Sequence, residues 1–207
     1  MRKSNLFPFL TYGILLTKFN SKEVLVKKQI LYFVILAVIV LTGCGTTTLS
    51  LKPDSKTDFT QFKSLTIKTA AADGVVIPDS AQTRIKDRVR AEISGGCCPK
   101  RFESIHIDNI QPDDLLLIIQ FTKYDEGNRF ARAMLAGLGA MKINADVEVK
   151  DGHSGNSICK GEAGKSFAWG GMLGAMTGIE DVEKDFAKEV SRGFGEMLGI
   201  APVSASK

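Results

Sequence analysis

The most regular alternation of apolar and polar residues in the chain runs from Met141 to Lys150. From Ile143 to Val149 every second residue is apolar, and the residues between are charged or amide side chains. This period of two predicts an antiparallel strand with one buried and one solvated face. Residues 151–155 have the composition of a turn, and 157–166 match the first strand in length. The pattern therefore predicts a β-hairpin.

Three further strands are predicted before this hairpin. Residues 64–70 alternate and are rich in β-branched side chains, and residues 102–107 have room for a short strand. Residues 115–124 form an almost continuous apolar run, which is typical of a central strand that is covered on both faces.

Two amphipathic helices complete the pattern. Apolar residues recur four apart from Ala81 to Ile93, and a second helical stripe runs from Ile179 to Met197. We therefore expect one α+β domain over residues 61–200, in the order strand-helix-strand-strand-strand-strand-helix. The sheet should be small and mostly antiparallel, with both helices on one face.

A different pattern precedes this domain. Lys27 and Lys28 are followed by an uncharged apolar run over residues 30–42, and then by Gly43 and Cys44. This is the build of a secretory signal, and the run is shorter than the ~20 residues that a spanning helix needs. Residues 41–44, Leu-Thr-Gly-Cys, resemble the lipobox of bacterial lipoproteins, which implies cleavage of the signal 27–43 and lipidation of Cys44. The alternative is an uncleaved anchor with a chance cysteine.

The remaining segments carry less information. Residues 1–26 are an unusual extension for such a leader and favour a start codon assigned too early, although a true extended leader is the alternative. Residues 44–60 are polar and without periodicity, which predicts a flexible tether. Residues 201–207 should be a disordered tail. Gly45 stands where lipoproteins retained at the inner membrane tend to have aspartate, so the resemblance implies an outer-membrane protein facing the periplasm, with the inner membrane as the alternative.

The charge of the chain changes once the leader is removed. The whole sequence has a net charge of +4, but residues 1–43 contribute +5 of it, so the mature chain is close to −1. Such a chain offers no electrostatic reason to bind nucleic acid, and we predict no nucleic-acid partner.

The cysteines and histidines allow one covalent link but no metal site. If Cys44 carries lipid, one disulfide can form in an oxidising compartment, from Cys97 or Cys98 to Cys159, and buried free thiols are the alternative. The histidines, His106 and His153, have no metal-ligand spacing. We predict no metal and no cofactor.

Two glycine-rich apolar segments, 127–140 and 167–178, interrupt the scheme. One precedes the first hairpin strand and the other follows the second, so an antiparallel hairpin should make them neighbours. They are either close-packed loops or an exposed apolar patch that binds a partner subunit or the membrane surface. The second segment has glycines four apart, as in a helix-packing glycine zipper. The candidate contact residues are Arg129, Arg132, Gly137, Gly139, Trp169, Gly170, Gly174 and Gly178, with the two arginines contacting anionic groups or pairing within the domain.

A family resemblance is carried by the first of these segments. Gly127-Asn128-Arg129, Arg132, Gly137, Gly139-Ala140 and Lys142, with Asp151 and Gly155, are similar to the core of the bacterial lipoproteins classed as domain of unknown function 4410. The resemblance spans about residues 63–199 and departs at Met141, where the family pattern has glycine. It implies a location and a fold rather than an activity.

The sequence favours a non-catalytic protein. Ser154 lies in a turn with no following helix, so it is not a nucleophile elbow, and Cys97-Cys98 is not a redox Cys-x-x-Cys pair. Our first hypothesis is a lipid-anchored accessory or binding module of the envelope. The alternatives are a lipoprotein that self-assembles through its glycine-rich segments, and a periplasmic hydrolase or redox protein.

Overall fold

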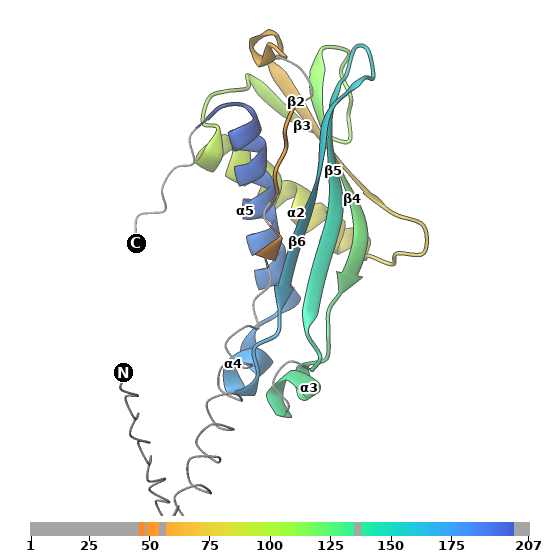
Figure 1. Ribbon diagram of the computed structural model, residues 1–207, viewed down its shortest axis with the longest axis vertical. Helices are drawn as coiled ribbons and strands as arrows, with labels where there is room; N and C mark the ends of the chain where they lie inside the picture. Colours follow the sequence, from red (N-terminus) through yellow and green to blue (C-terminus); the bar gives the residue numbers. More distant parts are fainter. Residues whose placement is uncertain (1–45, 48, 54–56, 135–137, 201–207) are drawn as a thin grey trace, which may run out of the picture. The chain divides into compact units, whose positions relative to one another are not determined.

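The computed structural model describes residues 46–47, 49–53, 57–134 and 138–200 (Figure 1). The predicted extension 1–26, the signal 27–43, Cys44, Gly137 and the tail 201–207 lie outside the described residues. They stay predictions.

The predicted hairpin is confirmed. Strand β5 (Met141–Asp151) pairs antiparallel with β6 (Ser157–Phe167), and the register places Met141 opposite Phe167. Strand β4 (Asp114–Asp125) pairs antiparallel with the other edge of β5. A bulge between Phe121 and Lys123 shifts the register near the end of β4.

The other half of the sheet is parallel. Strand β2 (Ser64–Ala71) lies between β4 and β3 (Ser104–Ile107) and runs parallel to both. A two-residue strand, β1 (Thr46–Thr47), pairs antiparallel with β6, which gives the order β1-β6-β5-β4-β2-β3. The sheet is therefore mixed, and the expectation of a mostly antiparallel sheet is wrong. Helix α2 (Asp79–Glu92) returns the chain to the end at which β2 began, so β3 runs in the same direction as β2.

The predicted order of elements is also wrong, because it omits β1 and two short helices. These are α3 (Arg129–Met134) between β4 and β5, and α4 (Gly171–Met176) between β6 and α5 (Ile179–Met197). A 3-10 turn (Phe59–Gln61) precedes β2, and a π-helical turn (Ile93–Cys97) follows α2. The α+β class itself is confirmed.

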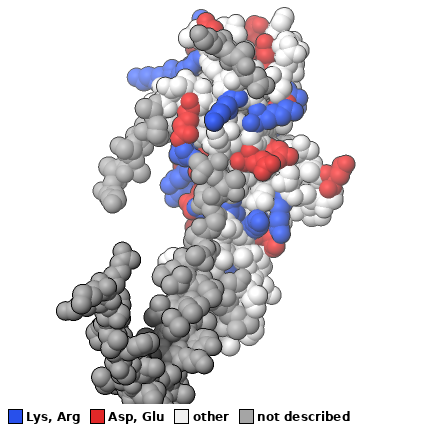
Figure 2. Space-filling view, in the orientation of Figure 1, with Lys and Arg blue, Asp and Glu red and all other residues white. Residues whose placement is uncertain are grey.

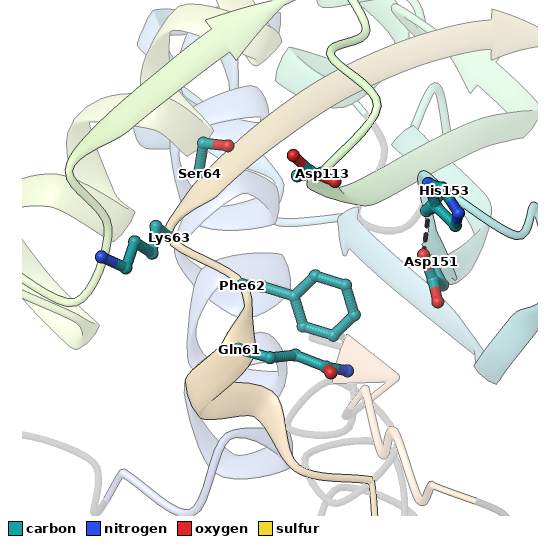
Figure 3. Close-up of a pocket in the computed structure, with 7 residues that line it drawn as sticks. All are labelled: Gln61, Phe62, Lys63, Ser64, Asp113, Asp151 and His153. Carbon is teal, nitrogen blue, oxygen red and sulfur yellow. Dashed lines mark hydrogen bonds between the residues drawn. The ribbon is translucent and has the colours of Figure 1, made fainter.

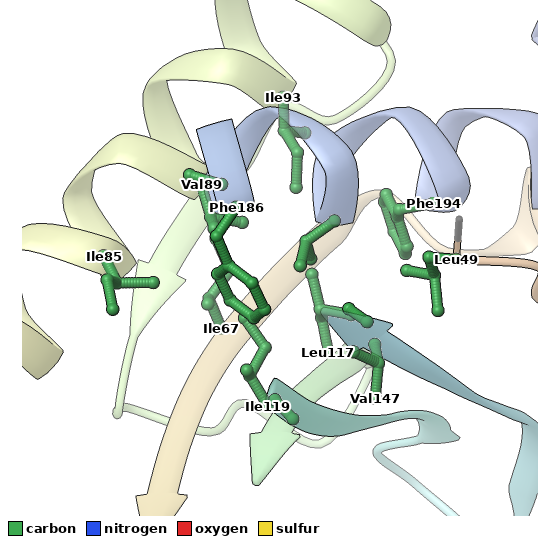
Figure 4. Packing of buried hydrophobic residues seen from close by; sticks show 14 of the residues in the cluster. Leu49, Ile67, Ile85, Val89, Ile93, Leu117, Ile119, Val147, Phe186 and Phe194 are labelled. Atoms are coloured by element: carbon green, nitrogen blue, oxygen red, sulfur yellow. The ribbon is translucent and has the colours of Figure 1, made fainter. Parts of the chain in front are cut away.

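The core lies between the sheet and the two long helices, α2 and α5, which cover one face (Figure 1). Figure 4 shows Ile85 and Val89 of α2 and Phe186 and Phe194 of α5 against the sheet residues. The opposite face is open along the second half of β4, because Gln120 is exposed and Ile118 only half-buried, whereas Leu116 on that face is buried. The expectation that β4 is covered on both faces is therefore wrong for the second half of the strand.

The predicted flexible tether is corrected over part of its length. Leu49 and Leu51 are buried in the core, and a Cβ added at Gly193 of α5 or Gly161 of β6 would lie within 3 Å of the Leu49 side chain. The Leu49 amide also donates to Glu189 Oε1 at 2.8 Å. Isolated leucines in a polar stretch have no periodicity, so the sequence pattern could not indicate that they pack against α5.

A buried carboxylate holds the start of β4. Asp114 is fully buried and accepts hydrogen bonds from the hydroxyls of Ser64 and Thr66 and from the Gln111 amide at 3.0 Å. Burial alone raises the pKa of Asp114, but these hydrogen bonds outweigh it and bring the pKa below its usual value. Asp114 therefore stabilises the fold as a carboxylate.

This network predicts acid sensitivity. Because the folded-state pKa of Asp114 is depressed, its stabilisation is complete above the unfolded pKa of about 4 and is lost as the pH falls through the folded pKa. We expect Asp114→Asn to cost about 1–2 kcal/mol at neutral pH, and this difference from wild type should shrink at acidic pH. Urea unfolding of the full chain from neutral to acidic pH measures this difference in unfolding free energy. Asp113→Asn, at an exposed position, is the control. A difference that is constant with pH would contradict the assignment.

Candidate functional site

The two glycine-rich segments meet at one end of the sheet, as expected. Helix α3 leads into β5 and helix α4 follows β6, and the two helices pack against each other (Figure 1). The hairpin register causes this, because Met141 at the start of β5 is opposite Phe167 at the end of β6. Residues about 40 positions apart in the sequence therefore form one surface.

Arg132 joins the two segments from inside. Its side chain is 1 % exposed, and all its described hydrogen bonds go to main-chain carbonyls. Nε donates to Gly174 at 3.0 Å, and one terminal nitrogen donates to Gly139 at 2.9 Å and to Glu126 at 3.3 Å. The other terminal nitrogen donates to Thr177 at 3.3 Å. The planar fork of the guanidinium thus binds the loops on both sides of the joint at once.

The role expected for Arg132 is therefore corrected. We expected it to contact an anionic partner or to pair on the surface, but it is buried and donates to main-chain carbonyls of both segments. Burial lowers the pKa of Arg132, and the nearby positive charge of Arg129 lowers it further. Arg129 itself is exposed, so it remains a candidate contact residue.

Three glycines make this joint possible. A Cβ at Gly174 would lie 2.0 Å from the Trp169 carbonyl oxygen, and one at Gly127 would lie 2.3 Å from that of Gly139. Gly139 has a φ of +69°, and its Cβ would lie 2.4 Å from the Asn128 carbonyl oxygen. Gly139 and Gly174 thus serve internal packing rather than partner contact, which corrects their predicted role.

The predicted glycine zipper does not form. Helix α4 ends at Met176 and α5 begins at Ile179, so Gly170, Gly174 and Gly178 do not share one helix. Gly170 precedes α4, and Gly178 is the N-cap of α5, where its amide donates to Asp181 Oδ2 at 3.2 Å. These positions end and begin helices rather than pack two helices together.

Around this joint, large apolar side chains face the solvent. Phe130 is 74 % exposed, and Met172 and Met176 are 79 % and 77 % exposed. We call the set of six the apolar tip: Phe130, Met134, Leu138, Trp169, Met172 and Met176. In Figure 2 this end of the described molecule is mostly white, while charged side chains gather over the rest. Exposed apolar residues concentrated on one rigid feature are typical of a binding surface rather than of scattered surface chemistry.

A buried ion-pair network supports the neighbouring start of α5. Glu183 is fully buried and accepts two hydrogen bonds from Arg84 of α2, at 2.7 and 2.9 Å, and one from Arg88 at 3.1 Å. The Tyr124 hydroxyl, near the end of β4, donates to the same carboxylate at 3.0 Å. Burial raises the pKa of Tyr124, and the negative charge of Glu183 raises it further. One carboxylate thus links α2, α5 and β4 beside the α3–α4 joint.

The predicted disulfide is not formed in the structure. Cys97, Cys98 and Cys159 are not joined by disulfides. The sulfur of Cys159 lies 3.2 Å from that of Met197, whereas the sulfurs of Cys97 and Cys98 lie 2.7 Å from each other. The π-helical turn that ends at Cys97 places this pair beside Gly195 of α5.

A cleft lies at the other end of β4, near the β5–β6 turn (Figure 3). It has a volume of about 570 Å³ and is lined by Gln61, Phe62, Lys63, Ser64, Asp113, Asp151 and His153. Asp151 does not act as a base here, because its carboxylate accepts from the main-chain amides of His153 at 2.8 Å and Ser154 at 3.3 Å. Burial raises the pKa of Asp151, but these hydrogen bonds outweigh it and lower the pKa. The carboxylate therefore stabilises a turn.

One serine–histidine contact lies on the edge strand β3. The Ser104 hydroxyl is 3.1 Å from His106 Nε2. A catalytic triad needs a carboxylate to orient the histidine. The nearby Asp114 is already bound by Ser64, Thr66 and the Gln111 amide, so this contact lacks its third member.

The described residues contain neither a cluster of three potential metal ligands nor a helix suited to spanning a membrane. No three potential metal ligands come together in this part of the chain. Within the same residues, no helix has the length and the apolar character that a bilayer-spanning segment requires.

Comparison with protein families decides the classification. The family described as domain of unknown function DUF4410 matches residues 47–171, which is more than half of the chain. The chain belongs to this family. The predicted membership is confirmed, and the match covers the strands β2 to β6 and the helices α2 and α3, ending at the first residue of α4. None of the curated proteins matches the DUF4410 chain.

Several solved structures are similar to this chain at low identity, with TM-scores below 0.5. Protein XCC0632 from Xanthomonas campestris is 14 % identical with a TM-score of 0.46, over 73 % of this chain and 94 % of its own. A PelC dodecamer subunit from Paraburkholderia phytofirmans is 13 % identical with a TM-score of 0.43, over 69 % and 96 %. A minor lipoprotein from Acinetobacter baumannii is 14 % identical with a TM-score of 0.36, over 65 % and 92 %.

Proposed function

We propose that this DUF4410 protein is a lipid-anchored, non-catalytic binding module of the bacterial envelope. The observation that carries the proposal is the apolar tip, six exposed apolar side chains on and beside two short helices that Arg132 clamps together. A rigid surface of this kind is suited to binding, since its shape does not have to be ordered at the moment of contact. The contacts of Asp151 and Asp114 argue against catalysis at the cleft and at Ser104.

The lipid anchor is the other half of the proposal. The basic residues, short apolar run and Leu-Thr-Gly-Cys sequence before the domain support acylation of Cys44. Gly45, where aspartate would favour retention at the inner membrane, supports the outer membrane.

Fatty-acid labelling with membrane fractionation tests this proposal. In cells fed labelled palmitate, we expect wild type to carry label and to fractionate with the outer membrane. Cys44→Ala should lose both the label and the membrane association, whereas Cys97→Ala, a matched control, should keep them. Gly45→Asp should keep the label but move to the inner membrane. A wild-type protein without label, or a labelled Cys44→Ala variant, would refute the anchor.

A further inference from the structure

We propose that the apolar tip docks in the lipid bilayer that holds the Cys44 anchor. This inference rests on the proposed function and names the occupant of its binding surface. Three observations carry it: the place at which the chain leaves the sheet toward Cys44, the position of the tip, and the chemistry of the tip.

The first observation is the pairing of β1 with β6. Thr46 is opposite Lys165 and Thr47 is opposite Gly164, in antiparallel register. Going back from Thr47 to Thr46, the chain therefore follows β6 toward its end at Phe167. Two peptide units join Thr46 to Cys44, which is at most about 7 Å of extended chain. Chain length alone therefore limits how far a lipid on Cys44 can be from Thr46 at this edge of the sheet.

The second observation is that the tip lies at the same end. Strand β6 ends at Phe167, and Trp169 and helix α4 follow directly. Trp169 is four residues from Lys165, the partner of Thr46, which is at most about 13 Å of chain. The burial of Leu49 and Leu51 removes the slack that a flexible tether would provide. A lipid inserted at Cys44 therefore holds the apolar tip next to the membrane surface.

The third observation is the chemistry of the tip. Its side chains are Phe, Met, Leu and Trp, of which tryptophan favours the interface between headgroups and acyl chains. Apolar faces of interfacial elements insert roughly 5–10 Å into this boundary, which short helices such as α3 and α4 can do without spanning the bilayer. The acidic side chains of Asp125 and Glu126 flank α3 beside the basic Arg129, so we expect apolar insertion rather than attraction to anionic lipid.

Docking also orients the domain. Strand β4 runs from the cleft end at Asp114 to the α3 end at Asp125. With the tip in the bilayer, the cleft near Asp113 and His153 would face away from the membrane.

Trp169 provides the test, because it is the single tryptophan of the sequence. The acylated full-length protein is reconstituted into phosphatidylcholine vesicles with or without bromine atoms on the acyl chains. Bromine quenches tryptophan on contact, so we expect brominated vesicles to remove most of the Trp169 emission. Bromines placed near the glycerol should quench more than those near the chain ends.

Two variants make the test specific. Met172→Asp/Met176→Asp places charge on two exposed tip positions and should abolish most of the quenching, while flotation shows that the lipid still holds the protein on the vesicles. Ile110→Asp, an exposed apolar position in the loop before β4, is the matched control and should leave the quenching unchanged. Circular dichroism confirms that the variants are folded.

The outcomes separate this inference from the proposed function. If the wild-type protein floats with the vesicles and brominated lipid quenches Trp169, both the proposed function and the docking inference are supported. Flotation of the wild type without quenching overturns the inference and leaves the anchored binding module intact. If brominated lipid does not quench Trp169 and cross-linking shows that a second copy of the chain covers this residue, the membrane-docking inference is overturned in favour of self-association. A protein that is not acylated and does not float refutes the proposed function.

Discussion

Replacing Arg132 with methionine is expected to open the joint between α3 and α4 and to lower the free energy of unfolding by about 3 kcal/mol. The substitution removes the Arg132 donor from the carbonyls of Gly174, Gly139, Thr177 and Glu126, of which that of Gly139 keeps the Asn128 amide as a donor. Each buried, unpaired carbonyl costs about 1–3 kcal/mol. Removing a buried charge offsets part of this cost, and water can reach some of the carbonyls at this end of the molecule. The costs of the individual carbonyls should therefore not add.

Lysine should not rescue Arg132. Its ammonium is a point donor and cannot span carbonyls that lie on both segments, so Arg132→Lys should behave almost as Arg132→Met. Arg129→Met is the matched control, because it removes the same charge from an exposed position on the same helix. Gly174→Ala is a second probe, since its Cβ would displace Trp169 without changing any charge.

Hydrogen exchange of the acylated protein in detergent locates the effect. In Arg132→Met and Gly174→Ala, amides of residues 127–134 and 171–178 should exchange faster, while those of β4 and β5 keep their protection. Unchanged exchange in the α3 and α4 segments would show that Arg132 is not the clamp.

The sequence predicted those elements whose residues face two different environments. The alternation from Ile143 to Val149 exists because β5 has one face on the core and one in water. The stripes of α2 and α5 have the same origin, since each helix buries one side only. Their type and approximate bounds followed from local pattern.

What the sequence did not predict depends on contacts between distant residues. The β2–β4 pairing is parallel because of how the chain returns through α2, and strand composition does not encode direction. Leu49 is buried by Gly161 and Gly193, more than 100 residues downstream.

The candidate site was predicted in position but not in the role of its residues. The hairpin argument brought the glycine-rich segments together, and the exposed Trp169 and Arg129 remain contact candidates. Arg132 was misassigned because arginine among glycines suggests a surface charge, and its acceptors are backbone carbonyls, which no side-chain pattern reveals. The sequence signal that would have indicated the apolar tip, and that was not used, is the pair of methionines in α4, which the structure shows to be exposed.

Replacing Glu183 with glutamine is expected to cost about 3 kcal/mol of unfolding free energy, because it leaves two arginines facing a neutral amide. In either orientation the amide nitrogen of glutamine would face a donor of Arg84, together with that of Tyr124 or Arg88, so at least one hydrogen bond is lost as well. We place the cost at the low end of the range for breaking a buried pair. The reason is that Arg84 and Arg88 are 36 % and 30 % exposed and can recover hydration.

Chemical denaturation of the acylated protein in detergent measures this cost, and Glu180→Gln is the matched control. Glu180 is exposed in the first turn of α5, and Arg88 contacts its main-chain carbonyl rather than its side chain. Removing its charge should cost less than about 1 kcal/mol, the usual value of an acidic residue at a helix N-terminus. Because Glu183 links the start of α5 to the end of β4, Glu183→Gln should also reduce the quenching of Trp169 by brominated lipid. A loss of stability no larger than that of Glu180→Gln would show that the buried network does not hold the base of the tip.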